Sequence, residues 1–143
     1  MTRLLLSLAI ICVACEYDDS RAISGKIIVR AYPEAFGSNH VFLAGHTEGG
    51  FSKPMTIDQE TTVTSGDITI NFKGIIDTGS LPANAPSAAC TIDLGELAFA
   101  TYNVMFINGD GRDFGKLEVR DIGVLLTIVN PVGVTVEDPK MSY

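Results

Sequence analysis

The segment 108–113, which reads NGDGRD, carries oxygen ligands at near-alternating spacing. Asn108, Asp110 and Asp113 carry side-chain oxygens of the kind that Ca²⁺ prefers. The series is one ligand short of an EF-hand loop and lacks its terminal Glu, and Arg112 adds a repelling charge. Asn and Gly also tolerate the positive φ of a tight hairpin turn. We therefore predict a hairpin turn, with these three residues as the candidate ligands if it binds a metal.

The other residues capable of chemistry form no recognisable catalytic set. His40 and His46 would lie about 20 Å apart on one side of a regular strand, too far to share a metal ion. Cys90 stands in an apolar segment with no His nearby in the sequence, which predicts a buried, unreactive thiol. No zinc-protease, phosphate-loop or nucleophile-elbow motif occurs. The sequence predicts a protein that is not an enzyme and that needs no cofactor.

The charge balance argues against nucleic acid as a partner. The chain of 143 residues carries 10 Lys and Arg against 17 Asp and Glu, a net charge of −7. Because phosphate binding requires a basic face, this balance excludes a DNA- or RNA-binding surface. A hydrophobic content of 46% is sufficient for one packed domain.

The N-terminal segment 1–14 has the pattern of a secretory signal peptide. Arg3 supplies the positive charge, and the ten apolar residues 4–13 follow it. This run is too short to span a bilayer, which takes about 20 residues. We predict a signal peptide over 1–14, an acidic tether over 15–20, and a frayed tail over 139–143.

The remaining segment, 21–138, shows short apolar runs separated by turn residues and no helical periodicity. Ile68, Ile70 and Phe72 alternate with polar residues, as in a strand that is buried on one face. Such spacing predicts an all-β sandwich or barrel. The expected strands are 21–32, 40–47, 54–64, 67–74, 88–94, 100–107, 114–120, 123–129 and 132–137.

The run 94–104, LGELAFATYNV, resembles the corner between two strands of bacterial immunoglobulin-like and fibronectin-III-like modules. In those modules the Tyr hydroxyl bonds back to the corner backbone. Phe99 and Ala100 replace the usual Pro-Gly. The resemblance implies an antiparallel immunoglobulin-like β-sandwich of about seven to nine strands. It also implies that Leu97 and Tyr102 form its structural corner.

The tetrapeptide 12–15, CVAC, resembles the lipobox of bacterial lipoproteins, although Cys12 stands where an aliphatic residue is usual. The resemblance implies that Cys15 is lipidated and anchors the chain to a membrane of the bacterial cell envelope, at its periplasmic or surface-exposed face. Cys90 is then left unpaired. Ordinary cleavage after Ala14, giving a secreted protein, is the alternative.

Three functions are compatible with these features. The first is a binding or scaffold module for envelope proteins or a surface ligand, which it contacts through loops at one end and the turn 108–113. The second is a structural subunit of a filament or envelope complex that assembles by strand addition, with 123–136 as the donated or accepting segment. The third is a module that binds Ca²⁺ or a small ligand.

Overall fold

The computed structural model describes residues 21–51, 55–78 and 87–137. The predicted signal peptide 1–14, the tether with Cys15, and the tail 139–143 lie outside these residues. Within the described ranges the protein is all-β, and no helix there is long and apolar enough to cross a membrane. Its strands are β1 (Ile27–Pro33), β2 (His40–Thr47), β3 (Met55–Val63), β4 (Asp67–Asp77), β5 (Ala89–Glu96), β6 (Thr101–Asn108), β7 (Gly111–Arg120), β8 (Gly123–Val129) and β9 (Val134–Val136).

The strand positions follow the sequence prediction closely. The bounds of β2 and β8 are those predicted, and β6 and β7 form the expected hairpin. The first strand was predicted from residue 21 but begins at Ile27. Gly25 adopts a φ of +102°, a left-handed conformation that interrupts an extended strand. β4 continues to Asp77 because it pairs with β3 along the whole length of that strand.

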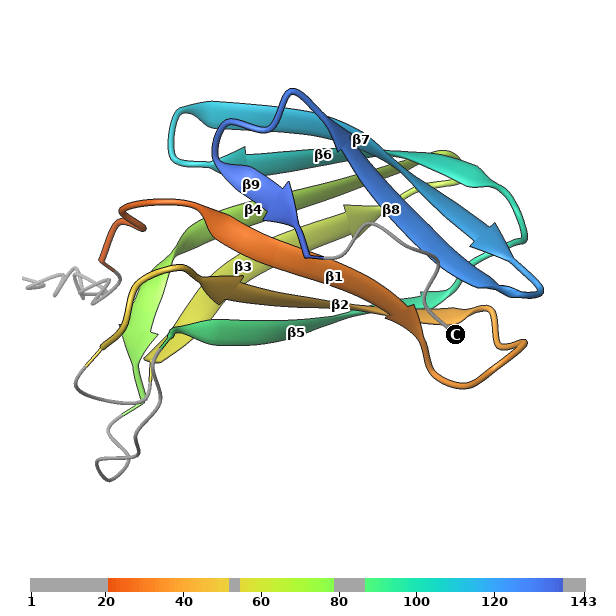
Figure 1. Cartoon of the computed structure of the whole chain (residues 1–143), viewed down its shortest axis with the longest axis horizontal. Coiled ribbons are helices and arrows are strands. Elements are labelled where there is room, and N and C mark those ends of the chain that lie inside the picture. Colours follow the sequence, from red (N-terminus) through yellow and green to blue (C-terminus); the bar gives the residue numbers. More distant parts are fainter. Residues whose placement is uncertain (1–20, 52–54, 79–86, 138–143) are drawn as a thin grey trace, which may run out of the picture.

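The nine strands form one sheet in the order β8-β7-β6-β4-β3-β5-β2-β1-β9. The sheet curls until β8 contacts β1 and β9, so the molecule is a nearly closed, flattened barrel (Figure 1). Among the described residues, one bridge pair joins β3 to β5, namely Thr56 with Ala89. The barrel therefore has two weakly joined seams, one at β3–β5 and one at β8–β1.

The sheet is mixed, whereas the sequence prediction was an antiparallel one. Three of its eight neighbouring strand pairs are parallel: β1–β9, β3–β5 and β4–β6. The strands β5 and β6 are consecutive in the chain but do not pair. The chain crosses at their corner to the other side of the barrel, and β6 then runs beside β4 in the same direction. Hydrophobic alternation identifies the buried face of a strand but carries no information about the direction of its neighbours.

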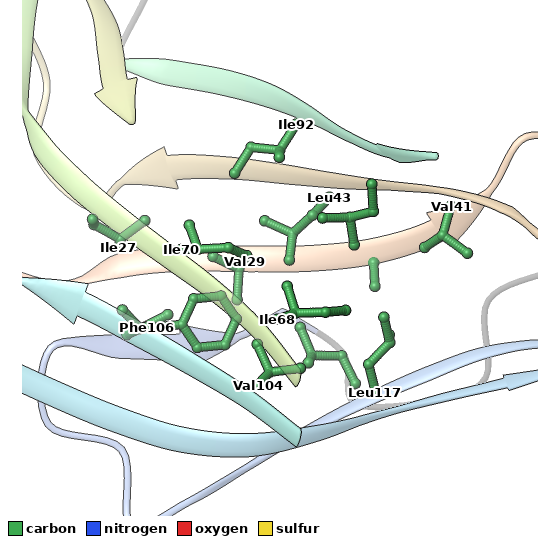
Figure 2. Close-up of a cluster of buried hydrophobic side chains, with 14 of the residues drawn as sticks. Ile27, Val29, Val41, Leu43, Ile68, Ile70, Ile92, Val104, Phe106 and Leu117 are labelled. Atoms are coloured by element: carbon green, nitrogen blue, oxygen red, sulfur yellow. The ribbon is translucent and has the colours of Figure 1, made fainter. Parts of the chain in front are cut away.

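The inward faces of the strands fill the barrel with aliphatic and aromatic side chains (Figure 2). Ile68, Ile70 and Phe72 of β4 all point inward, as their spacing predicted. The rings of Phe72 and Phe106 stack in parallel, with centroids 6.3 Å apart. Each large side chain buried in this way contributes about 1.5–3 kcal/mol to stability. The core includes Ile27, Val29, Val41, Leu43, Ile57, Leu117, Val119 and Val124.

Candidate functional site: the loops at one end of the barrel

The predicted turn at 108–113 is a two-residue hairpin loop. Asn108 pairs with Gly111, so Gly109 and Asp110 form the loop itself. Gly109 has a φ of +59°, which suits the first central position of a type II′ turn and which other residues adopt only with strain. Asp110 is exposed at the tip.

Asp113 is buried, with 3% of its surface exposed, and its carboxylate serves the fold. Oδ1 accepts the backbone N–H of Val132 at 2.6 Å, and Oδ2 accepts those of Gly133 and Val134 at 2.8 Å each. Hydrogen bonds to an ionised acceptor are stronger than neutral ones. The side chain thus attaches the β8–β9 connection and the start of β9 to β7.

Asn108 has a similar internal role. Its side-chain amide donates to the carbonyls of Gly25 (3.3 Å) and Gly133 (3.5 Å). Asn108 and Asp113 are therefore engaged with backbone groups, while Asp110 stands apart at the tip. In the part of the chain that the structure describes, no three His, Cys, Asp or Glu residues are grouped so that they could hold a metal ion.

We expect Asp113→Ala to lower the free energy of unfolding by about 3 kcal/mol or more. The substitution leaves three backbone N–H groups without their acceptor, and an unpaired buried group costs about 1–3 kcal/mol. Asp110→Ala is the matched control, because it removes an exposed carboxylate from the same hairpin and should change stability by about 0.5 kcal/mol or less. Urea denaturation measures both. Equal losses in the two variants would contradict the role assigned to Asp113.

Cys90 is placed as a partly buried thiol. It has no disulfide partner among the described residues, and burial raises the pKa of its thiol to about 11. A thiol with such a pKa is protonated at neutral pH and is a poor nucleophile.

The corner between β5 and β6 is held by several hydrogen bonds, among them that from the Val119 N–H to the Ala100 carbonyl at 2.9 Å. The Tyr102 hydroxyl donates to the carbonyl of Ala98 at 3.2 Å, four residues upstream. The N–H of Leu97 donates to the carbonyl of Asn39 at 2.9 Å. Leu97 and Tyr102 are both buried, whereas Phe99 at the apex is exposed. The corner is thus fastened to the β1–β2 loop while it presents an aromatic ring to solvent.

Three loops meet at this end of the barrel: β1–β2 (34–39), β5–β6 (97–100) and β7–β8 (121–122). Besides the hydrogen bond between Leu97 and Asn39, a Cβ at Gly37 would lie 3.8 Å from the carbonyl oxygen of Asp121. Asp121 and Phe99 also line one hollow of about 530 Å³. Figure 1 shows the three loops at the end of the barrel opposite to the red segment with which the described chain begins. We call them the distal loop cluster.

Each loop of the distal cluster exposes one large apolar side chain. Phe36 is 73% exposed, Phe99 is 58% exposed and Ile122 is 47% exposed. Clustered exposed apolar side chains on a folded domain mark contact sites more often than isolated ones do. The sequence predicted a contact surface formed by loops at one end, but it did not indicate these three residues. Phe36 and Ile122 each precede a glycine, whereas Phe99 stands between two alanines. Which loops share an end depends on the topology.

An acidic rim with one histidine borders this cluster. His40 Nε2 lies 2.7 Å from Asp93 Oδ1, and His40 Nδ1 lies 3.9 Å from Glu34 Oε2. The His40 ring stacks on Phe42 with centroids 4.9 Å apart, and Phe42 stacks on Tyr32. The hydrogen bond to Asp93 raises the pKa of His40, and the same bond is the main reason that the pKa of Asp93 is lowered. The charge of the rim therefore depends on pH.

We expect the pair of His40 and Asp93 to stabilise the fold most between pH 3.8 and 6.5, the ordinary pKa values of the two groups. Because the pKa of His40 is raised on folding, its contribution is complete below 6.5 and is lost as the pH rises through the folded-state pKa. Because the pKa of Asp93 is lowered, its contribution is complete above 3.8 and is lost as the pH falls through the folded-state pKa.

An NMR titration of the His40 ring checks this expectation. Its pKa should lie above 6.5 in the native protein and fall towards 6.5 in Asp93→Asn. Asp58→Asn, on β3 and outside the contacts of His40, should leave the His40 titration unchanged. An unaltered His40 pKa in Asp93→Asn would show that the hydrogen bond does not operate in solution.

No protein-family model, curated protein or solved structure matches this chain. What the molecule does is therefore inferred from its own geometry.

Proposed function

We propose that this protein is a non-enzymatic binding module of the bacterial cell envelope, anchored by a lipid on Cys15, that docks a protein partner on the distal loop cluster. One observation carries the proposal. Three loops that contact one another each expose a large apolar side chain, at the end of the barrel away from Arg21. A chain held to a membrane by its N-terminal segment presents that end outward.

The charges around the cluster indicate the chemistry of the partner. Glu34, Asp93, Glu96 and Asp121 lie on or beside the three loops, and the whole chain carries a net charge of −7. An apolar centre with a charged rim is the usual composition of a protein interface, and complementary charge speeds association. The favoured partner is a protein surface with an apolar patch and a basic border.

An immunoglobulin-like ancestry of the domain is part of this proposal. The hydroxyl of Tyr102 bonds back to the corner backbone, as the resemblance of residues 94–104 implies. The three parallel strand pairs count against a direct correspondence of topology. Secretion without an anchor is the alternative for Cys15, and it leaves the binding role unchanged.

Strand addition is the second candidate function, and the seam between β3 and β5 favours it. Beyond Thr56, β3 has no partner on its β5 side among the described residues. Two features oppose addition at this edge, namely a bulge between Asp58 and Gln59 and the charge of Glu60. The segment 123–136, which we expected to donate or accept a strand, already forms β8 and β9 within the barrel.

Site-specific photo-crosslinking tests the distal cluster. We expect a photoreactive phenylalanine at position 99, in the full chain on living cells, to yield one discrete adduct with another protein. The double variant Phe36→Ser/Ile122→Ser should reduce that adduct about tenfold or more, because truncation of an interface anchor costs more than 1 kcal/mol. Position 114 is the matched control, since Phe114 is 59% exposed and Phe99 is 58% exposed. Equal crosslinking from both positions would refute a specific contact surface.

Incorporation of radiolabelled palmitate in a bacterial host tests the anchor. We expect the native chain and Cys90→Ser to carry the label and Cys15→Ser to lose it, because acylation requires the thiol of Cys15. Label that persists in Cys15→Ser would exclude lipidation at this residue.

A further inference from the structure

A second surface lies on the outer face of β4, β6, β7 and β8. It is a trough of about 560 Å³ that runs across the four strands. The residues that line it belong to three adjacent rows of the sheet. Ile68, Val104 and Gly115 occupy the middle row, and the side chains of Ile68 and Val104 point into the core. The backbone of this middle row therefore forms the floor of the trough.

One bank of the trough is largely apolar. Thr69, Met105, Phe114 and Val129 are partners across successive strands, so their side chains stand in one row. Phe114 and Val129 are largely exposed, and Met105 is partly exposed. The row spans three strand spacings, about 14 Å. It offers a ligand a continuous apolar edge that includes one aromatic ring.

The opposite bank is polar and has both signs of charge. Asp67, Asn103, Lys116 and Thr127 form the second complete row across the same strands, and all four are exposed. The Asn103 amide donates to Asp67 Oδ1 at 3.0 Å, which leaves the Asn103 carbonyl and the other Asp67 oxygen available as acceptors. Among the described residues no carboxylate lies within ion-pair distance of the Lys116 ammonium. The bank thus supplies donors and acceptors together.

The two banks restrict the chemistry of an occupant. An anion would meet the carboxylate of Asp67, and a cation would meet the ammonium of Lys116. An acyl chain would use the apolar bank alone. A chain of sugar rings uses both, because its hydroxyls donate and accept hydrogen bonds while its C–H faces pack on aliphatic and aromatic side chains.

We propose that this trough binds a neutral oligosaccharide. Phe114 and Met105 contact the apolar faces of the sugar rings, and Asp67, Asn103 and Lys116 hydrogen-bond their hydroxyls. The trough lies on the outer face of the sheet, and the hollow that Phe99 and Asp121 line begins at the next outward row, at Thr101 and Glu118. Binding in the trough does not depend on the function proposed for the distal loop cluster.

A glycan array of neutral oligosaccharides, probed with the full chain, tests the site. We expect a subset of glycans to bind. The best soluble glycan from the array should then shift the backbone amide resonances of Val104, Gly115 and Lys116 in ¹H–¹⁵N NMR spectra. Absence of any bound glycan, or shifts confined to residues outside the trough, would overturn the proposal.

Two variants and a matched control complete the test. Phe114→Ala and Asn103→Ala, both at exposed positions that should not disturb folding, are each expected to weaken glycan binding about tenfold, which corresponds to about 1.4 kcal/mol. Phe99→Ala removes an equally exposed ring from the distal cluster and should leave glycan binding unchanged. Undiminished binding by Phe114→Ala would refute the assignment. Sodium dodecanoate that shifts the same amides in both native protein and Asn103→Ala, while no glycan binds, would assign the trough to acyl chains instead.

Discussion

The carboxylate of Asp113 is the interaction on which the closure of this barrel depends. β9 has three residues and one partner, β1, to which it runs parallel. A strand of three residues is stabilised only slightly by its own backbone hydrogen bonds to β1. Asp113 supplies three further hydrogen bonds to the backbone just ahead of and at the start of β9, from a buried position inside β7. A charged group at this depth is tolerated because several donors replace its hydration.

This attachment joins the two ends of the sheet. β7 lies next to the last strand on one side, and β9 is the last strand on the other. β8 and β1 face each other without backbone hydrogen bonds between them. The hydrogen bonds of Asp113, which connect β7 to the start of β9, therefore help to close the sheet. Asn108 adds a second connection from the same hairpin to Gly25 and Gly133. In the turn whose oxygens suggested a metal site, backbone N–H groups thus bind the Asp113 oxygens that a cation would otherwise bind.

The two proposed contact surfaces arise from different properties of the same sheet. The trough follows from strand alternation, because residues at every second position of four adjacent strands point outward and their rows line up. The distal loop cluster follows from connectivity, because β1, β5 and β7 all end at the same end of the barrel. Phe99 belongs to the cluster and Phe114 to the trough, although both are simply exposed aromatic residues by composition. Their separation allows each surface to be tested with the other as its control.

The sequence alone determined that the protein is all-β and where most of its strands lie. Alternation and turn residues are local signals, so β2, β8 and the β6–β7 hairpin could be placed without knowledge of any neighbour. The buried face of β4 was determined in the same way. The placement of Phe36, Phe99 and Ile122 on adjoining loops could not be predicted, because these loops are far apart in the chain. The same holds for the parallel pairing of β4 with β6.

Asp113 shows most clearly what only the tertiary structure decided. From its neighbours it resembled a calcium ligand at a polar turn. In the structure it faces the core, because it lies on the inward side of β7, at a position that alternates along the strand with Leu117 and Val119. Its function is set by three N–H groups that lie about twenty residues further along the chain. Local sequence specifies which groups a residue offers, but the fold specifies which groups it meets, and hydrogen bonding depends on both.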